Sequence, residues 1–335
     1  MTGTMRFENL LDLARLPYFE IRNGRLIVAD PSVGPVIDAH THLALSFVRR
    51  SCLDLEAISA PTQHYLPATR AVDLDAYANK NFQPDDLSRM RRDLTLKCLT
   101  GTGMRATHTV PNLEREMYEL GISRALLLAI DFPFVSDNAG AYLRVAAGHP
   151  SLVCYGSVHP YSFGMTKKVD QQKAMGARGI KVHPATQMVR PDNPRCMKLY
   201  SLCGERNLPI FFHCGPVGIE PAAGRRRAQV HLYEAPIAEH PNTTFVLGHS
   251  GALQMEQALD LANRYKNTWL DLACQSLSSV RTILEKGPTD RIVFGTDWPF
   301  YHQAIGLAKV LVATEGDVAL RRRVLHDNAA RLLGD

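Results

Sequence analysis

The segment VIDAHTHLAL, residues 36–45, carries an apolar approach and then two histidines on alternating positions. Side chains two positions apart in a β-strand project to the same face, so His40 and His42 would point the same way with backbones about 7 Å apart. Two imidazoles side by side at the end of a strand form half of a metal-binding site. Other strand ends must bring the remaining ligands to the same place.

Seven further apolar runs follow, and each ends in a polar or glycine-containing corner before a helical pattern. Strands that alternate with helices are typical of a parallel sheet covered by helices, and eight such units favour a closed α/β barrel, the (β/α)₈ or TIM barrel, over an open sheet. The predicted strands after the first are ISRALLLAID (122–131), LVCYGSVHP (152–160), ARGIKVHP (177–184), LPIFFHCG (208–215), TTFVLGHSG (243–251), NTWLDLAC (267–274) and RIVFGTDWP (291–299).

Two segments lie outside this alternation. Residues 18–30 predict a short N-terminal hairpin around Asn23 and Gly24, because Asn-Gly is a strong turn signal. Residues 44–110 are polar and partly helical, and we expect a helical insertion after the first strand that folds over the barrel mouth. We expect a single domain over residues 1–335, with a second domain in the insertion as the alternative.

Composition narrows the classes of function. No apolar run reaches the roughly 18 residues of a membrane span, and the first residues lack a signal-peptide core, so we expect a cytoplasmic protein that does not contact membranes. The net charge of +5 is mild and scattered, which favours a small anionic substrate and argues against nucleic acid as a partner. Seven cysteines without a Cys-x-x-Cys pair indicate neither a disulfide framework nor a zinc ribbon.

Polar side chains collect at the predicted strand ends, where barrel enzymes carry their chemistry. A lone histidine at a strand end is more often structural than a ligand. Several imidazoles that meet a carboxylate, however, make a natural site for Zn²⁺ or a similar divalent ion. The residues at these ends are His40, His42, His159, Lys181, His183, His213, His249 and Asp297.

The motifs HTH, GIKVHP, FFHCG, LGHSG and FGTDWPF, in this order, resemble the amidohydrolase superfamily. More narrowly, they resemble the amidohydrolase-related branch that includes aminocarboxymuconate-semialdehyde decarboxylase and several aromatic-acid decarboxylases. The resemblance runs from about residue 36 to the terminal NAARLLGD and is poor in the insertion. It implies one divalent metal, with zinc favoured over manganese or iron, held by His40, His42, His213 and Asp297. It also implies that His249 is the catalytic histidine beside the reacting water.

A divalent ion in such a site lowers the pKa of a bound water from about 16 to near 7. His249 would orient this water or move its proton, and the free oxygen of Asp297 would accept and return a proton. We therefore expect a metal-dependent hydrolase of an ester, lactone or amide of a small carboxylated substrate. The motifs leave a non-oxidative decarboxylase open as the alternative. A barrel that only binds a ligand is a third reading, which the presence of all four ligands disfavours.

Lys181 and His183 alternate in GIKVHP, so we expect both to point into the barrel. Elsewhere in the superfamily a lysine at this strand end is carboxylated and bridges two metals, and His213 and His249 then hold the second ion. The relatives that GIKVHP most resembles hold one metal, so we expect a free Lys181 amine suited to a substrate carboxylate.

The insertion is expected to supply specificity. Three of its arginines, Arg49, Arg70 and Arg105, are candidates to pair with a substrate carboxylate. Barrels of this branch are often dimers, so the resemblance allows a homodimer, while the sequence itself does not fix the oligomeric state.

Overall fold

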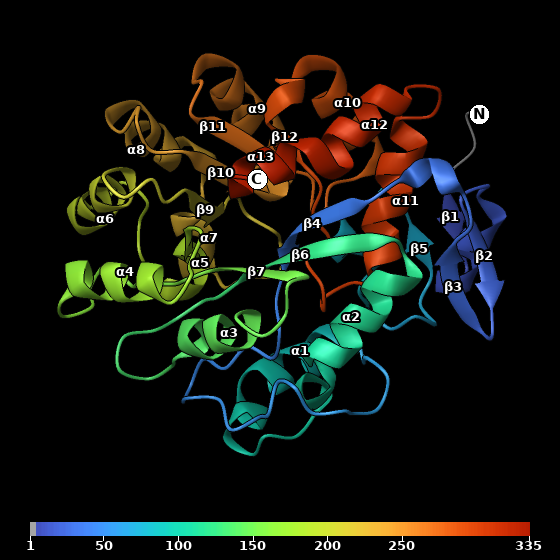
Figure 1. Cartoon of the computed structure of the whole chain (residues 1–335), viewed down its shortest axis with the longest axis horizontal. Coiled ribbons are helices and arrows are strands. Elements are labelled where there is room, and N and C mark those ends of the chain that lie inside the picture. Colours follow the sequence, from blue (N-terminus) through green and yellow to red (C-terminus); the bar gives the residue numbers. More distant parts are fainter. Residues whose placement is uncertain (1–4) are drawn as a thin grey trace.

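The computed structural model describes residues 5–335, and within this range eight parallel strands form the predicted barrel (Figure 1). β8 to β12 pair in one run, and β4, β6 and β7 pair in another. Parallel bridges between Thr41 and Trp298 and between Gly156 and Ile180 join the two runs and close the barrel. The strands are β4 (Val36–Thr41), β6 (Ile122–Leu128), β7 (Leu152–Tyr155), β8 (Ile180–Val182), β9 (Ile210–His213), β10 (Phe245–Gly248), β11 (Thr268–Asp271) and β12 (Ile292–Val293).

Every strand is shorter than the apolar run that predicts it. The largest difference is at β12, where the sequence predicts a strand over 291–299 and the regular strand covers Ile292–Val293. The chain beyond β12 turns at Asp297, whose φ of 64° is incompatible with a strand. This turn brings the Asp297 side chain toward β4. The early end of β12 therefore places Asp297 beside the histidines of the HTH motif.

Alternate strand residues fill the barrel interior, and their sequence neighbours pack outward against the helices. Burial on both faces explains why the strands read as continuous apolar runs. The C-terminal helix α13 (Asn328–Leu333) adds three side chains to the interior cluster and so closes the end of the barrel away from the site. The interior cluster contains Ile37, Ala39, Leu126, Leu128, Val153, Tyr155, Phe211, Val246, Trp269, Val293, Ala329, Leu332 and Leu333.

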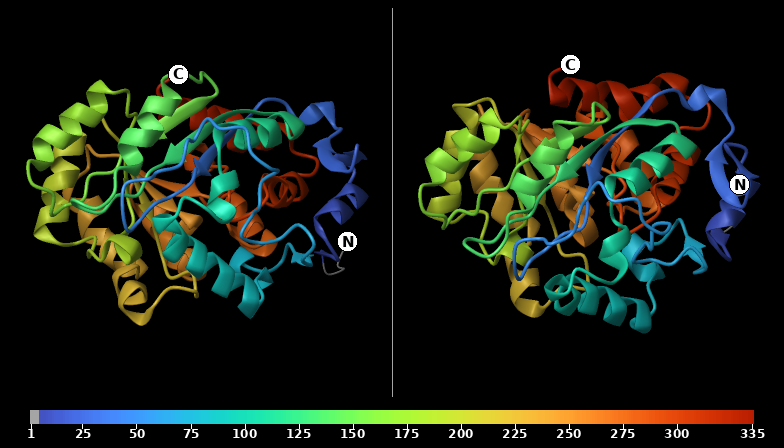
Figure 2. Two further views of the ribbon diagram at one scale, coloured as in Figure 1. Left: turned by 90° about the horizontal axis from the view of Figure 1, so that it is seen from below. Right: turned by 60° about the horizontal axis from the view of Figure 1, so that its bottom comes forward.

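Helices surround the barrel (Figure 2). One helix of several turns follows most strands, as the predicted alternation requires. The covering helices are α2 (Val110–Glu119), α3 (Asn138–Ala146), α4 (Met165–Ala174), α6 (Pro194–Gly204), α8 (Glu234–Glu239), α9 (Met255–Arg264), α10 (Leu277–Lys286) and α11 (Gln303–Ala313). Three further short helices are α5 (Pro184–Gln187), α7 (Ala222–Arg227) and α12 (Val318–Arg322).

Both segments outside the alternation adopt the expected structures. β2 (Phe19–Arg22) and β3 (Arg25–Val28) pair antiparallel around Asn23 and Gly24, whose φ angles of 51° and 72° suit the tight turn of a hairpin. The insertion contains a short strand, β5 (Val72–Asp73), paired with β1 (Arg6–Phe7), and the helix α1 (Pro84–Leu94). Proline at the first turn and the Asp86 carboxylate on the Gln83 N–H (3.0 Å) start this helix.

Residues 5–335 contain no helix that is both long enough and apolar enough to span a bilayer.

Replacing Leu126 by alanine should lower the free energy of unfolding by about 2–5 kcal/mol, because a buried leucine in a close-packed interior leaves a cavity. Leu126 is fully buried in the barrel interior. Equilibrium urea unfolding measures the change. The matched control is Leu96→Ala, which removes a side chain that is 64% exposed and should change stability by less than about 0.5 kcal/mol. Equal losses in the two variants would contradict the packing described here.

Candidate metal centre

The predicted site residues come together at the C-terminal end of the barrel. Each lies at or just after a strand end, because parallel strands of a closed barrel all end on the same side. His42, Lys181, His183, His213, His249 and Asp297 line one cavity, and His40 lies buried beside Asp297. His159 does not line this cavity; its Nε2 contacts the Gln187 carbonyl oxygen at 3.0 Å.

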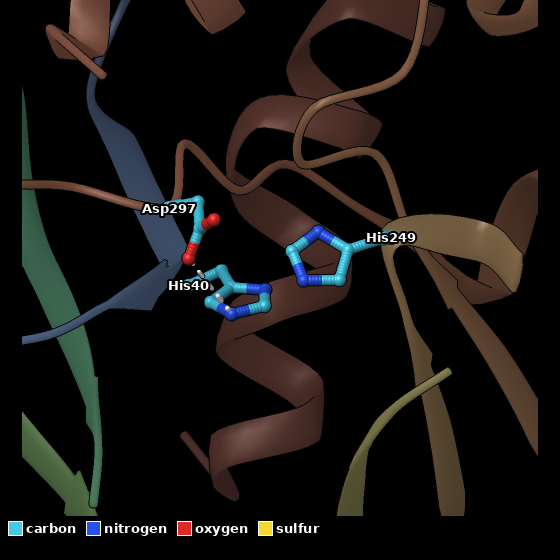
Figure 3. Close-up of side chains that lie close together, drawn as sticks. All are labelled: His40, His249 and Asp297. Carbon is cyan, nitrogen blue, oxygen red and sulfur yellow. Dashed lines mark ion pairs between the residues drawn. The ribbon is translucent and has the colours of Figure 1, made fainter. Parts of the chain in front are cut away.

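Five of these side chains form a continuous cluster, and three of them are drawn in Figure 3. One donor atom each from His40, His249 and Asp297 lies within 4.8 Å of the others. His42 Nε2 lies 3.2 Å from Asp297 Oδ1, and His213 Nδ1 lies 3.1 Å from His249 Nε2. The predicted ligands are thus neighbours. His249, which we expected to act on the reacting water and not to bind the metal, lies as close to His40 and Asp297 as a ligand would.

Hydrogen bonds fix the orientation of both histidines of the HTH motif. His40 Nδ1 donates to Asp271 Oδ2 at 2.7 Å, and His42 Nδ1 donates to the Leu128 carbonyl oxygen at 2.7 Å. Because these acceptors require a proton on Nδ1, the Nε2 atom of each neutral ring carries a lone pair. A partner on the far ring nitrogen is the usual support of a metal-binding histidine.

The positions of the histidine Nε2 atoms relative to Asp297 indicate whether a cation fits between them. His40 Nε2 and His42 Nε2 face Asp297 Oδ1 at 3.5 and 3.2 Å, so electron-rich atoms of three side chains converge. Such a contact is favourable only when a proton or a metal cation lies between the atoms. A proton on His40 is disfavoured, because burial and then the nearby Lys181 and histidines hold its pKa well below the ordinary value. The donor set therefore fits a divalent metal.

Asp271 is a residue that sequence reasoning missed. Its carboxylate accepts three hydrogen bonds, from His40 Nδ1, from the His249 N–H at 2.9 Å and from the Ala273 N–H at 3.0 Å. It thereby ties β4 to the loop after β10. The signal was present in NTWLDLAC as a strand-end aspartate, but sequence alone gave no reason to distinguish it from a surface carboxylate.

Burial governs the protonation of the remaining groups. It lowers the pKa of His249 to about 4 and holds the pKa values of His183 and His213 well below the ordinary value, so these rings are neutral at pH 7. It also lowers the pKa of Lys181, against the opposing attraction of Asp271 and Asp297. Burial alone would raise the pKa of Asp297, but His42, His249 and Lys181 outweigh it and keep this pKa below the ordinary value.

Lys181 and His183 take different positions. Lys181 Nζ lies 4.6 Å from the centre of the Phe211 ring and 3.5 Å from the Phe212 carbonyl oxygen. The His183 ring stacks on His213 with 3.8 Å between ring centres, while Thr186 contacts both His183 ring nitrogens at 3.2 Å. His183 thus buttresses His213.

Unusual backbone conformations concentrate at this site. His249, Cys274 and Asp297 have φ angles of 56°, 67° and 64°, in the left-handed region that non-glycine residues rarely adopt. Each such residue costs about 1–3 kcal/mol unless its surroundings hold it in place. Cys274, which the sequence did not single out, directs its Sγ to Asp297 Oδ2 at 3.5 Å.

The cavity has a volume of about 430 Å³. Its inner wall is the cluster, and the insertion supplies much of the rest, as predicted for a segment folded over the mouth. Most of the wall is apolar, which is usual for a small-molecule site. The apolar lining includes Leu45, Phe47, Met90, Leu94, Ile130, Val217 and Phe300.

The predicted arginines do not line the cavity. Arg49 contacts the Leu99 carbonyl oxygen at 3.3 Å, and Arg70 pairs with Asp85 and Asp86 at 2.8 and 2.9 Å. Arg105 is fully buried away from the cavity. The arginine that does line the cavity is Arg91 on α1. It was missed from the sequence because the packing of α1 decides which of its side chains face the cavity, and composition does not show that packing.

Replacing Asp271 by asparagine should weaken zinc binding by about 10–100-fold, the usual effect of removing a partner that orients a ligand. An amide cannot accept all three N–H groups that converge on this carboxylate. Chelator competition measures the zinc dissociation constant. The control is Asp260→Asn; among residues 5–335 the exposed Asp260 carboxylate pairs with Arg264 alone, at 2.8 Å. Unchanged affinity in the Asp271 variant would show that the hydrogen bond to His40 does not support metal binding.

Solved structures share this architecture. An uncharacterized TIM-barrel protein of Bordetella bronchiseptica is 17% identical, with a TM-score of 0.62 over 89% of this chain and 98% of that one. A probable 2-pyrone-4,6-dicarboxylic acid hydrolase of Acinetobacter baumannii, with citric acid bound, is 16% identical, with a TM-score of 0.59 over 90% and 99%. A 5-carboxyvanillate decarboxylase of Novosphingobium aromaticivorans, complexed with manganese and 4-hydroxy-3-methoxy-5-nitrobenzoic acid, is 13% identical, with a TM-score of 0.61 over 90% and 96%.

These likenesses establish the fold. No curated protein sequence matches the chain significantly. The amidohydrolase family model, in contrast, matches residues 37–334, a range that begins within β4 and ends in the C-terminal helix. Together with the barrel and the histidine–aspartate cluster at its mouth, this match shows that the chain belongs to the amidohydrolase family of metal-dependent enzymes.

Proposed function

We propose that the chain is a hydrolase that cleaves an ester, lactone or amide bond of a small carboxylated compound. The observation that carries this proposal is the divided role of the Asp297 carboxylate. Its Oδ1 faces His40 and His42, whereas its Oδ2 contacts only the Cys274 thiol among the described residues. One oxygen is thus available to a cation and the other to a proton.

In this proposal His40, His42, His213 and Asp297 hold one divalent ion, with zinc as the ion that three imidazoles and a carboxylate favour. When bound, the ion supplies Lewis-acid activation of water and of substrate oxygens. Manganese or iron is the alternative. A free Lys181 amine accompanies the single ion, because its contacts are the Phe211 ring and the Phe212 carbonyl oxygen.

Asp297 and His249 move the protons. Asp297 Oδ2 accepts a proton from water as the water oxygen bonds to the carbonyl carbon, and returns it to the leaving oxygen or nitrogen as the old bond breaks. Because the Ala273 carbonyl oxygen keeps the ring proton on Nδ1, His249 Nε2 accepts a hydrogen bond from the reacting water and holds this water in line. Its position is fixed from two sides, by the Asp271 carboxylate on its N–H and by the Ala273 carbonyl oxygen 3.3 Å from its Nδ1.

Non-oxidative decarboxylation on the same residues is the second candidate. The observation that favours it is the apolar wall, in which Phe47 and Phe300 could pack against an aromatic acid. The 5-carboxyvanillate decarboxylase with this fold is consistent with that candidate, and the probable 2-pyrone-4,6-dicarboxylic acid hydrolase with the first.

His249→Asn should retain one metal ion per chain and lose about 10²–10⁴-fold in kcat, because the proposal gives His249 a part in proton transfer and none in holding the ion. Elemental analysis and steady-state kinetics measure the two quantities. The contrasting variant, His40→Ala with His42→Ala, should lose both the metal and the activity. If His249→Asn also loses the metal, His249 is a ligand; two ions per wild-type chain would contradict the single-metal site.

Two measurements together decide between hydrolysis and decarboxylation: incorporation of oxygen-18 from water and release of CO₂. Hydrolysis in oxygen-18 water should place label in a product of an ester, lactone or amide substrate without release of CO₂. Aromatic and unsaturated carboxylic acids tested in parallel should release no CO₂. Release of CO₂ without label would replace the hydrolase proposal by the decarboxylase. Mass spectrometry of products and a coupled CO₂ assay provide the measurement, with the chelator-treated enzyme as the blank.

A further inference from the structure

The cavity wall contains two buried polar groups that the proposed reaction does not use. Tyr77 of the insertion is 6% exposed, and its hydroxyl lacks a hydrogen-bond partner among residues 5–335. The Glu220 side chain, in the loop between β9 and α7, is 9% exposed, and both of its carboxylate oxygens are also without a hydrogen bond in this part of the chain. Both residues line the cavity.

Neighbouring polar groups of the same wall are satisfied. Asn79 donates from Nδ2 to the Val217 carbonyl oxygen at 3.0 Å and accepts from the Tyr301 hydroxyl. Arg91 donates to the Ile219 carbonyl oxygen at 3.2 Å. The cation nearest to Glu220 is Arg225, with its Nε 3.7 Å away and its side chain half exposed. This distance is too long for a hydrogen bond, so Glu220 has no full internal partner.

An unpartnered buried polar group destabilises a folded chain, and two in one cavity wall call for an explanation in function. Tyr77 is close to the cluster, because the N–H of the next residue, Ala78, donates to the Cys274 carbonyl oxygen at 2.9 Å and Cys274 contacts Asp297. Burial, followed by Cys274, Asp297 and Glu220, raises the pKa of Tyr77 well above its ordinary value, so the phenol keeps its proton. A phenol can donate and accept, whereas a carboxylate only accepts. Together they complement a group that carries an N–H or O–H.

We propose that Tyr77 and Glu220 form a subsite that binds a hydroxyl or amino group of the substrate. The substrate is then a hydroxy- or amino-substituted carboxylated compound. Like charge keeps its carboxylate away from Glu220, so the hydroxyl or amino group is the part that binds there. That this compound is the substrate rests on the proposed function, while the binding preference does not.

Binding of matched probes to the metal-loaded protein tests the subsite without turnover. The probes are 3- and 4-aminobenzoate, 3- and 4-hydroxybenzoate, and the 3- and 4-methylbenzoates, in which a methyl group of similar size cannot donate. Calorimetry should give about 10- to 100-fold tighter binding of a donor-bearing probe than of its methyl counterpart, the value of a hydrogen bond to a charged group. The preference should fall to within about twofold in Glu220→Leu and be reduced in Tyr77→Phe.

Stability provides a second readout. In the absence of a probe, Tyr77→Phe and Glu220→Leu should melt at or above the wild-type temperature, because each removes an unpartnered buried group. A merely structural role would lower the melting temperature instead. The controls are Tyr118→Phe, whose ring is 88% exposed, and Glu285→Leu on the exposed face of α10. Both should keep the probe preference. If Glu220→Leu fails to fold, Glu220→Gln replaces it, with an intermediate loss of preference for the amino probes.

The proposal is overturned if no donor-bearing probe binds, if the methylbenzoates bind equally well, or if the preference survives both substitutions. Failure of the hydrolase proposal has a different signature. The metal content and the probe preference would then be intact, while no ester, lactone or amide is hydrolysed in a metal-dependent way.

Discussion

Contact between the first and last strands is the constraint on which the site depends. The Ala39 N–H donates to the Phe294 carbonyl oxygen at 2.8 Å, the Asp297 N–H to the His40 carbonyl oxygen at 2.8 Å, and the His42 N–H to the Trp298 carbonyl oxygen at 2.7 Å. This seam closes the barrel. It also places the HTH motif and Asp297, which come from opposite ends of the sequence, in direct contact.

Buried polar groups hold the seam. Asp38 accepts hydrogen bonds from the Thr296 N–H at 3.1 Å, the Thr296 hydroxyl at 2.5 Å and Gln303 Nε2 at 2.7 Å. Trp298, next to Asp297, donates its ring N–H to Glu116 on α2 at 3.2 Å. Asp38 is fully buried, and this burial raises its pKa to about 7 despite these bonds. The low-dielectric surroundings that hold the strands together also strengthen electrostatic interactions at the adjacent cluster.

The barrel and most of the cluster could be predicted because their signals are local. Alternation at a strand end puts His40 and His42 on one face, and closure of the barrel brings His213, His249 and Asp297 to the same end whatever the details of packing. Asp271 and Cys274 were missed because their roles depend on contacts across β10 and β12, which no spacing in NTWLDLAC encodes. The insertion has no repeating pattern, so composition pointed to Arg49, Arg70 and Arg105, whereas the fold puts Tyr77 and Arg91 at the cavity.

The division of labour along the chain has an evolutionary consequence. The reacting groups stand on the barrel strands, whereas much of the outer cavity wall belongs to the contiguous insertion after β4 and to the loop after β9. Exchange of one surface segment by recombination could therefore alter which compounds enter while the strand-borne residues stay in place. Loops tolerate such change better than the strands they connect. In such a barrel the residues that react and the residues that select the substrate lie in different segments of the chain. Related proteins can therefore diverge in substrate while the metal centre stays the same.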